Sequence, residues 1–103
     1  MKRILICLAA AFLAAPACAQ QTRSYGAEDV AGFSCNPNGA VMQLRDGGRI
    51  YLGRSCDASV PGHGAGHWWY AAHATVVVAP GFEGFFNFVE PPCKSLTYCA
   101  PPK

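Results

Sequence analysis

Residues 40–53 read AVMQLRDGGRIYLG, two short apolar runs on either side of Arg-Asp-Gly-Gly. Asp-Gly between apolar runs is a strong local signal for a β-hairpin, because both residues accept the positive φ angles of a tight turn. With Asp46 and Gly47 as the two turn residues, Met42 lies opposite Tyr51. The stretch therefore predicts an antiparallel pair of strands from which the rest of the fold can be built.

Two further apolar stretches extend this sheet towards the C-terminus. Residues 67–79 carry no Asp, Glu, Lys or Arg and alternate with a period of two, which predicts one strand. Its even positions are expected to face a core: Trp68, Tyr70, Ala72, Ala74, Val76 and Val78. Residues 82–89 predict a further strand whose core-facing residues are Phe82, Phe86 and Phe88. Glycine and proline bound each segment, so we expect an all-β fold: a small antiparallel sheet or partly open barrel of four to five strands.

The N-terminus has the organisation of a secretory signal peptide. A basic start, an apolar run too short to span a membrane and a small-x-small cleavage site end at Ala19. Lipid attachment at Cys18 is the alternative to ordinary cleavage. We expect residues 1–19 to be removed and residues 20–103 to form a single domain. Within it, residues 20–32 are expected to form a flexible arm with one helical turn near residues 27–30, and residues 100–103 a free tail.

Four cysteines remain after residue 19, and an even number in a small exported chain predicts two disulfides. Of the three possible connectivities we favour Cys35–Cys56, which brackets the predicted hairpin, with Cys93–Cys99, which closes a short loop. A zinc–thiolate site is the alternative, although paired C-x2-C spacings are absent from the sequence.

Charge and size restrict the possible functions. Six acidic and six basic residues follow residue 19, so no net charge attracts nucleic acid or an anionic membrane. No serine lies in a G-x-S-x-G motif, and a stapled chain of this size leaves little room for a pocket of about 300 Å3. We therefore expect a protein that is not an enzyme, with no catalytic residue, no cofactor and no transmembrane segment.

An interaction surface is the remaining candidate, because eleven aromatic residues follow residue 19 and so small a core cannot enclose all of them. Exposed aromatic side chains bury much area at low cost in rotamer entropy. The residues expected on this surface are Trp69, His67, His73 and Phe85. The glycine-rich segment before them is expected to form an adjoining loop that could insert into a partner, through Gly62, His63, Gly64 and Gly66.

The three histidines give the competing hypothesis, a periplasmic copper- or zinc-binding protein. Imidazole is a common ligand for both metals. His63 and His67, with Asp57 as a third ligand, could meet in a folded loop. His67 and His73 cannot share a metal on one strand, because six residues separate them by about 20 Å.

In size, export and disulfide stapling, the chain resembles the bacterial periplasmic lysozyme inhibitors, small β proteins that push a loop into an enzyme cleft. Residues 61–70 are placed as such a loop would be, but no motif of that group is present and no residue role is carried over. The expected function is binding of an unknown protein or glycan in a bacterial-type envelope, by a periplasmic or secreted monomer with an inhibitor or accessory role.

Overall fold

The computed structural model describes residues 21–96 and 99–101. The predicted signal peptide and the last two residues of the predicted tail lie outside the described residues. Within the described residues, eight strands and one short 3-10 turn form the fold. They are β1 (Gln21–Tyr25), η2 (Ala27–Asp29), β2 (Val30–Asn36), β3 (Gly39–Leu44), β4 (Arg49–Gly53), β5 (Asp57–Val60), β6 (Gly64–Ala71), β7 (Ala74–Ala79) and β8 (Phe82–Asn87). The all-β prediction is confirmed, but the sheet has eight strands rather than four to five.

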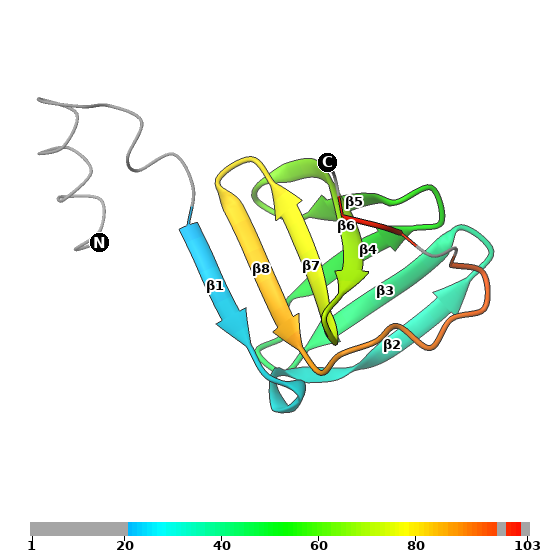
Figure 1. Ribbon diagram of the computed structural model, residues 1–103, viewed down its shortest axis with the longest axis horizontal. Coiled ribbons are helices and arrows are strands. Elements are labelled where there is room, and N and C mark those ends of the chain that lie inside the picture. The colour runs from blue at the N-terminus through cyan, green and yellow to red at the C-terminus, as the bar shows by residue number, and fades with distance from the viewer. Residues whose placement is uncertain (1–20, 97–98, 102–103) are drawn as a thin grey trace, which may run out of the picture.

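One sheet contains all eight strands and curls into a half-barrel (Figure 1). Strands β2 to β8 follow one another as an antiparallel meander, in the spatial order of the sequence. Strand β1 pairs in parallel with β8, so β1 and β2 form opposite edges although only η2 separates them in the chain. Because the short connection through η2 joins these two edge strands, the sheet must curl until β1 and β2 lie close to each other at that end.

The hairpin at residues 40–53 is confirmed as β3–β4, in a register shifted by one residue from the prediction. Met42 lies opposite Ile50, not Tyr51. The turn contains three residues instead of two, because the Leu44 N–H donates to the Gly48 carbonyl while Gly47 adopts a φ of +95°. A type I turn followed by a left-handed residue is the usual three-residue hairpin, and Gly47 supplies that conformation.

The single strand predicted over residues 67–79 is wrong, because Ala72 and His73 form a two-residue turn that divides it into β6 and β7. Both residues have positive φ, +53° and +63°. This is the backbone of a primed hairpin turn, but the usual Asn-Gly or Asp-Gly signature is absent. The turn reverses the alternation, so Val77 instead of Val76 lies beside Trp68 on the core side.

The loop predicted through Gly62, His63, Gly64 and Gly66 is reduced to a three-residue turn, because Gly64 and Gly66 belong to β6. Residues 57–60 form β5, and only three residues separate it from β6. The His63 N–H donates to the Val60 carbonyl across Pro61 and Gly62, whose φ is +86°. Gly66 lies inside β6, where a Cβ would collide with the Val78 carbonyl. Glycine therefore serves close strand packing at this position rather than a mobile loop.

Residues 21–32, predicted as a flexible arm, instead form β1, η2 and the start of β2. The expected helical turn is confirmed as η2. Tyr25 stacks on Phe86 of β8 with ring centroids 4.4 Å apart. The Asn87 amide donates to the Ser24 hydroxyl and the Tyr25 carbonyl, at 2.9 and 3.0 Å. These contacts with β8 hold β1 at the edge of the sheet.

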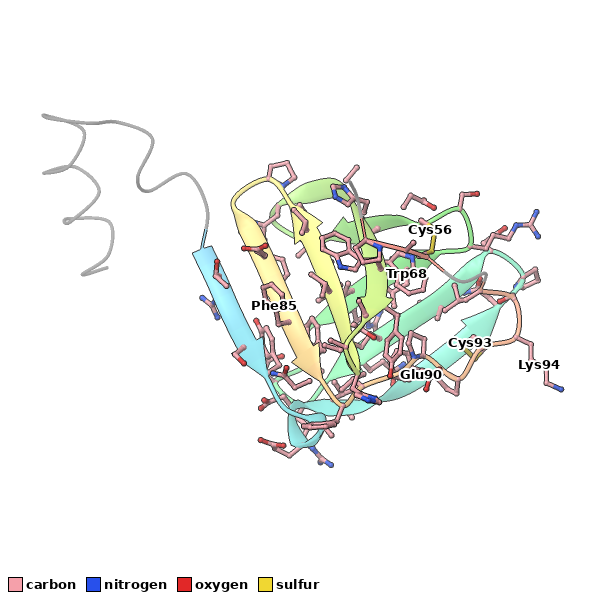
Figure 2. The ribbon with its side chains drawn as sticks, in the orientation of Figure 1. Cys56, Trp68, Phe85, Glu90, Cys93 and Lys94 are labelled. Carbon is pink, nitrogen blue, oxygen red and sulfur yellow. A yellow bond between two sulfur atoms is a disulfide. The ribbon has the colours of Figure 1, made fainter. Side chains whose placement is uncertain are left out.

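The core lies on the concave side of the sheet. Its largest fully buried side chains include Met42, Leu52, Val77 and Phe86. Trp68 belongs to this core (Figure 2). Its indole N–H donates to the Gly53 carbonyl at 2.9 Å, so its polar atom is satisfied.

The predicted core positions of Phe82 and Phe86 are confirmed, and that of Phe88 is wrong. Phe88 is 80% exposed with a φ of +60°, because β8 ends at Asn87 and the chain then turns. The alternation that would bury Phe88 is therefore interrupted one residue before it.

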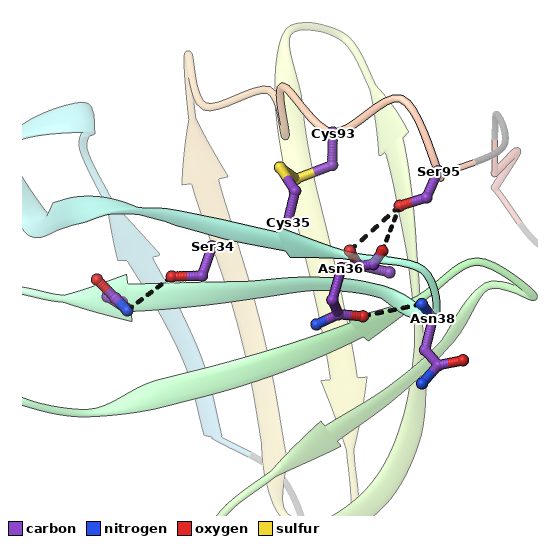
Figure 3. Close-up of a disulfide and its surroundings, with 8 residues drawn as sticks. Ser34, Cys35, Asn36, Asn38, Cys93 and Ser95 are labelled. Atoms are coloured by element: carbon purple, nitrogen blue, oxygen red, sulfur yellow. Dashed lines mark hydrogen bonds between the residues drawn. A yellow bond between two sulfur atoms is a disulfide. The ribbon is translucent and has the colours of Figure 1, made fainter.

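Two disulfides form, as predicted, but in a different connectivity: Cys35–Cys93 and Cys56–Cys99. The predicted Cys35–Cys56 and Cys93–Cys99 pairs are wrong. Strands β3 and β4 separate Cys35 from Cys56, and two strand spacings are about 10 Å, beyond the reach of a disulfide. Both observed bonds instead hold the C-terminal segment, residues 88–96 and 99–101, against the sheet (Figure 3 shows the first).

Candidate binding surface

The face of the sheet opposite the core brings together three of the four residues predicted as a binding surface. Across β6, β7 and β8, Trp69 lies opposite Val76, and Val76 lies opposite Phe85. The neighbouring row places His67 opposite Val78. Trp69 and Phe85 are thus joined through β7, a contact that a single strand over residues 67–79 would not provide. We call His67, Trp69, Val76, Val78 and Phe85 the outer aromatic face.

The side chains of the outer aromatic face pack on one another. The imidazole of His67 stacks on Trp69 with ring centroids 5.6 Å apart and planes at 21°. Val76 is only 3% exposed although it points away from the core, since Trp69 and Phe85 flank it. Trp69 and Phe85 are half-buried, and Trp69 also contacts the edge of the core cluster. The result is a packed apolar centre on the side of the sheet that the core does not use.

Polar groups border this face on β1 and β8. The Thr22 hydroxyl donates to Glu83 at 2.8 Å, and Asn87 donates to Ser24. An apolar centre with a polar rim is the usual composition of a protein–protein interface.

His73, the fourth predicted surface residue, lies in the β6–β7 turn instead of on the face. Its carbonyl accepts the backbone N–H of Phe88 at 2.6 Å, so the turn and the end of β8 are joined. Phe88 is the most exposed large apolar side chain of the described residues. The sequence did not identify it as a surface residue, because the period of two assigned it to the core.

The predicted inserting loop contributes no free loop to the surface. The Nδ1–H of His63 donates to the Pro80 carbonyl at 3.0 Å, because a carbonyl oxygen can only accept. Its ring also lies 5.3 Å from that of Phe82. His63 thus ties the β5–β6 turn to the β7–β8 turn. Gly62 belongs to the same turn, whereas Gly64 and Gly66 belong to β6.

The structure brings together two of the three residues of the alternative metal site. Asp57 and His67 are cross-strand partners on β5 and β6, whereas His63 is engaged with Pro80. Within residues 21–96 and 99–101, no three His, Cys, Asp or Glu side chains lie close enough to hold a metal ion.

The expectation that the chain lacks room for a pocket is wrong. A cavity of about 520 Å3 lies between β6 and the C-terminal segment, on the opposite side of the sheet from the outer aromatic face. Among the described residues, Glu90, Pro91 and Leu96 of the C-terminal segment line it on the side that faces Trp68 and Tyr70. The sequence predicted that Cys93 and Cys99 close a short loop. In the structure, this part of the chain forms one wall of a cavity.

Comparison with known proteins finds no family model, no curated protein and no solved structure that matches this chain. Among the described residues, no helix has the length and apolar character needed to cross a membrane. Two disulfides are typical of proteins that fold outside the reducing cytosol.

Proposed function

We propose that this protein is exported to a bacterial-type envelope, as a periplasmic or secreted protein, and binds a protein partner there through the outer aromatic face without catalysing a reaction. The observation that carries the proposal is the continuous row formed by Trp69, Val76 and Phe85 on the side of the sheet that the core does not use.

The composition of β7 supports this proposal. An antiparallel sheet with a core on one side is expected to be polar on the other. On β7 the outward residues are Ala74, Val76 and Val78, and none is polar. On β5 in the same sheet, the corresponding residues are Asp57 and Ser59. The outward residues of β7 are thus apolar where those of β5 are polar.

The shape of the surface favours a protein over a glycan as the partner on this face. The surface is built on paired strands. Its accessible apolar groups are the half-buried side chains of Trp69, Val78 and Phe85, spread over three strands around the buried Val76, which suits another apolar protein surface. An inhibitor that inserts a loop gains no support, because the β5–β6 connection is a three-residue turn held by His63.

Site-specific photocrosslinking in the native compartment tests the proposal. A photoreactive phenylalanine analogue at position 69 is expected to capture one protein species, and the same analogue at position 51 is expected to capture none. Tyr51 is the matched control, since it is 41% exposed on the same side of the sheet but lies on β4.

Point variants complete this test. Trp69→Ala and Phe85→Ala are expected to weaken binding of the captured partner at least about tenfold, as truncation of central aromatic residues does at interfaces. Tyr51→Ala is expected to leave it unchanged. Equal capture from positions 69 and 51, or full binding by a folded Trp69→Ala variant, would show that the surface is assigned wrongly.

A further inference from the structure

A hollow on the outward side of β3, β4 and β5 is a further candidate site, apart from the outer aromatic face. Gly39 of β3 lies opposite Gly53 of β4, so the sheet carries no side chain at either position. In the next outward row, Tyr51 lies between Val41 and Ser59. The two glycines thus leave a cavity of about 340 Å3 beside this row, within the range of small-ligand sites, about 300–1,000 Å3.

The hollow holds a carboxylate that no other group of the protein neutralises. The carboxylate of Asp57 lies against Gly53, where a Cβ would collide with it, so the glycine provides the room that the carboxylate occupies. Asp57 is exposed, and its carboxylate forms no hydrogen bond or ion pair with any residue among 21–96 and 99–101. No lysine or arginine in these ranges lines the hollow. Its walls therefore carry one uncompensated negative charge.

Neutral hydrogen-bonding groups surround this carboxylate. Asn36 and Asn38 close the hollow at the β2–β3 turn, and Figure 3 shows their side chains pointing away from the disulfide and the C-terminal segment. The side-chain oxygen of Asn36 accepts the backbone N–H of Asn38 at 2.8 Å. The Asn38 side chain and the hydroxyl groups of Tyr51 and Ser59 have no hydrogen-bond partner in the part of the chain that the structure describes. Their oxygen atoms are therefore available to a donor.

We propose that this hollow binds a small primary amine in its protonated form. The ammonium group would pair with Asp57, and its three N–H donors match the oxygen atoms around that carboxylate. Tyr51 is 41% exposed, so its ring adds a cation–π attraction. Val41, beside Tyr51, can contact a short alkyl chain.

Other classes of ligand match the hollow less well. Asp57 repels an anion, and a neutral ligand leaves its charge uncompensated. A quaternary ammonium has no N–H to donate and is usually held in a cage of several aromatic rings, whereas Tyr51 is the one aromatic residue among the described residues of the lining. Ca2+ takes about six to eight oxygen ligands, commonly from several carboxylates, and Asp57 supplies the one carboxylate that the described lining contains.

Titration of the 15N-labelled, disulfide-intact protein with butylammonium chloride at constant ionic strength tests this proposal. The backbone amide signals of Val41, Tyr51 and Ser59 are expected to shift, and those of Trp69 and Phe85 to stay unchanged. Butan-1-ol is the matched control ligand, because it has the same chain without the charge. Tetramethylammonium, butyrate and calcium chloride represent the other classes. None of these four is expected to give a saturable shift at the concentrations at which butylammonium does.

Matched variants assign the contact. Asp57→Asn keeps the shape of the side chain and is expected to weaken butylammonium binding at least about fivefold, because a charge-assisted hydrogen bond becomes a neutral one. Tyr51→Ala is expected to weaken it about threefold through loss of the aromatic ring. Glu83→Gln removes a carboxylate from the outward side of β8 and is the control, which is expected to bind as the wild type does.

Three results each overturn the proposal. They are no saturable shift with butylammonium at about 50 mM, beyond the millimolar affinity expected of so small a ligand, equal binding of butan-1-ol or of any competing ligand, and undiminished binding by a folded Asp57→Asn variant. This site and the outer aromatic face are tested separately. Tyr51→Ala is expected to leave binding of the protein partner unchanged, and Trp69→Ala to leave binding of the amine unchanged.

Discussion

Gly66 is the residue at which the close approach of two strands can be tested most directly. A Cβ at this position would overlap the Val78 carbonyl of β7. Gly66→Ala must therefore push β6 and β7 apart, and overpacking of this kind costs about 1–3 kcal/mol. Gly32 of β2 is the matched control, because a Cβ added there would have no neighbouring atom within 4 Å and its φ is not in the left-handed region.

Urea denaturation of both glycine variants provides the measurement. Gly66→Ala is expected to lower the free energy of unfolding by that amount, and Gly32→Ala to change it by no more than about 0.5 kcal/mol. Equal stabilities for the two variants would contradict the close packing of β6 on β7.

Thr75 supports the C-terminal segment from inside the sheet. Its side chain is fully buried, and its hydroxyl donates to the Val89 carbonyl at 2.6 Å. Thr75→Val keeps the shape of the side chain but leaves that carbonyl without a donor, so we expect a loss of about 1–3 kcal/mol. Thr75→Ser keeps the hydroxyl and is expected to retain more of the stability, as thermal unfolding would measure. A Thr75→Val variant as stable as the wild type would show that this hydrogen bond contributes nothing.

The face of the sheet on which a side chain lies could be predicted where the alternation along a strand alone determines it. Trp68 and Phe86 were assigned to the core, and their neighbours Trp69 and Phe85 to the other face, which agrees with the structure. Phe88 could not be predicted, because its exposure depends on where β8 ends, and a period of two carries no information about that end.

At the scale of elements, the β6–β7 turn gives a prediction of increased rather than decreased stability. Ala72 and His73 both occupy the left-handed region, where side chains with a Cβ are strained. Asn-Gly is the preferred pair for such a turn. The double variant Ala72→Asn, His73→Gly is therefore expected to raise the free energy of unfolding by about 1 kcal/mol.

The turn variant is checked by thermal unfolding against Ala31→Asn, an exposed substitution outside any turn of positive φ. No stabilisation by the turn variant would indicate that the backbone of residues 72–73 differs from a primed turn. Binding to a partner of the outer aromatic face is expected to be retained, since neither residue belongs to that face.

Elements were predictable where local chemistry determines them. Asp46 and Gly47 indicated a hairpin, although two or three turn residues could not be distinguished, and that choice shifts the register by one. The pairing of β1 with β8 joins residues as far apart in the chain as Thr22 and Glu83, 61 positions. A short polar strand has no local signal for such a partner, so the sequence alone suggested an arm.

At the scale of the whole molecule, the two disulfides turn an open meander into a closed body with a cavity. Each one closes a long loop, since the partners are 58 and 43 residues apart. The chain-entropy model gives about 4 kcal/mol for either loop. Small domains have about 5–15 kcal/mol of net stability, so the loss of both bonds would remove much of it. The sequence predicted the number of disulfides correctly but not their connectivity. The connectivity depends on strands β3 and β4 lying between Cys35 and Cys56.

Two double variants test this connectivity through stability. Cys35→Ser with Cys93→Ser removes one disulfide and is expected to cost about 4 kcal/mol while leaving no free thiol. Cys35→Ser with Cys56→Ser removes one partner of each bond, so both contributions are lost and the protein is expected to be largely unfolded at about 37 °C. Chemical denaturation and thiol titration of the two variants distinguish the possible disulfide connectivities. The pairing of neighbours along the chain, Cys35 with Cys56 and Cys93 with Cys99, requires the reverse: the second variant would then be the more stable one, with no free thiol, and the wall of the cavity would not be attached to the sheet.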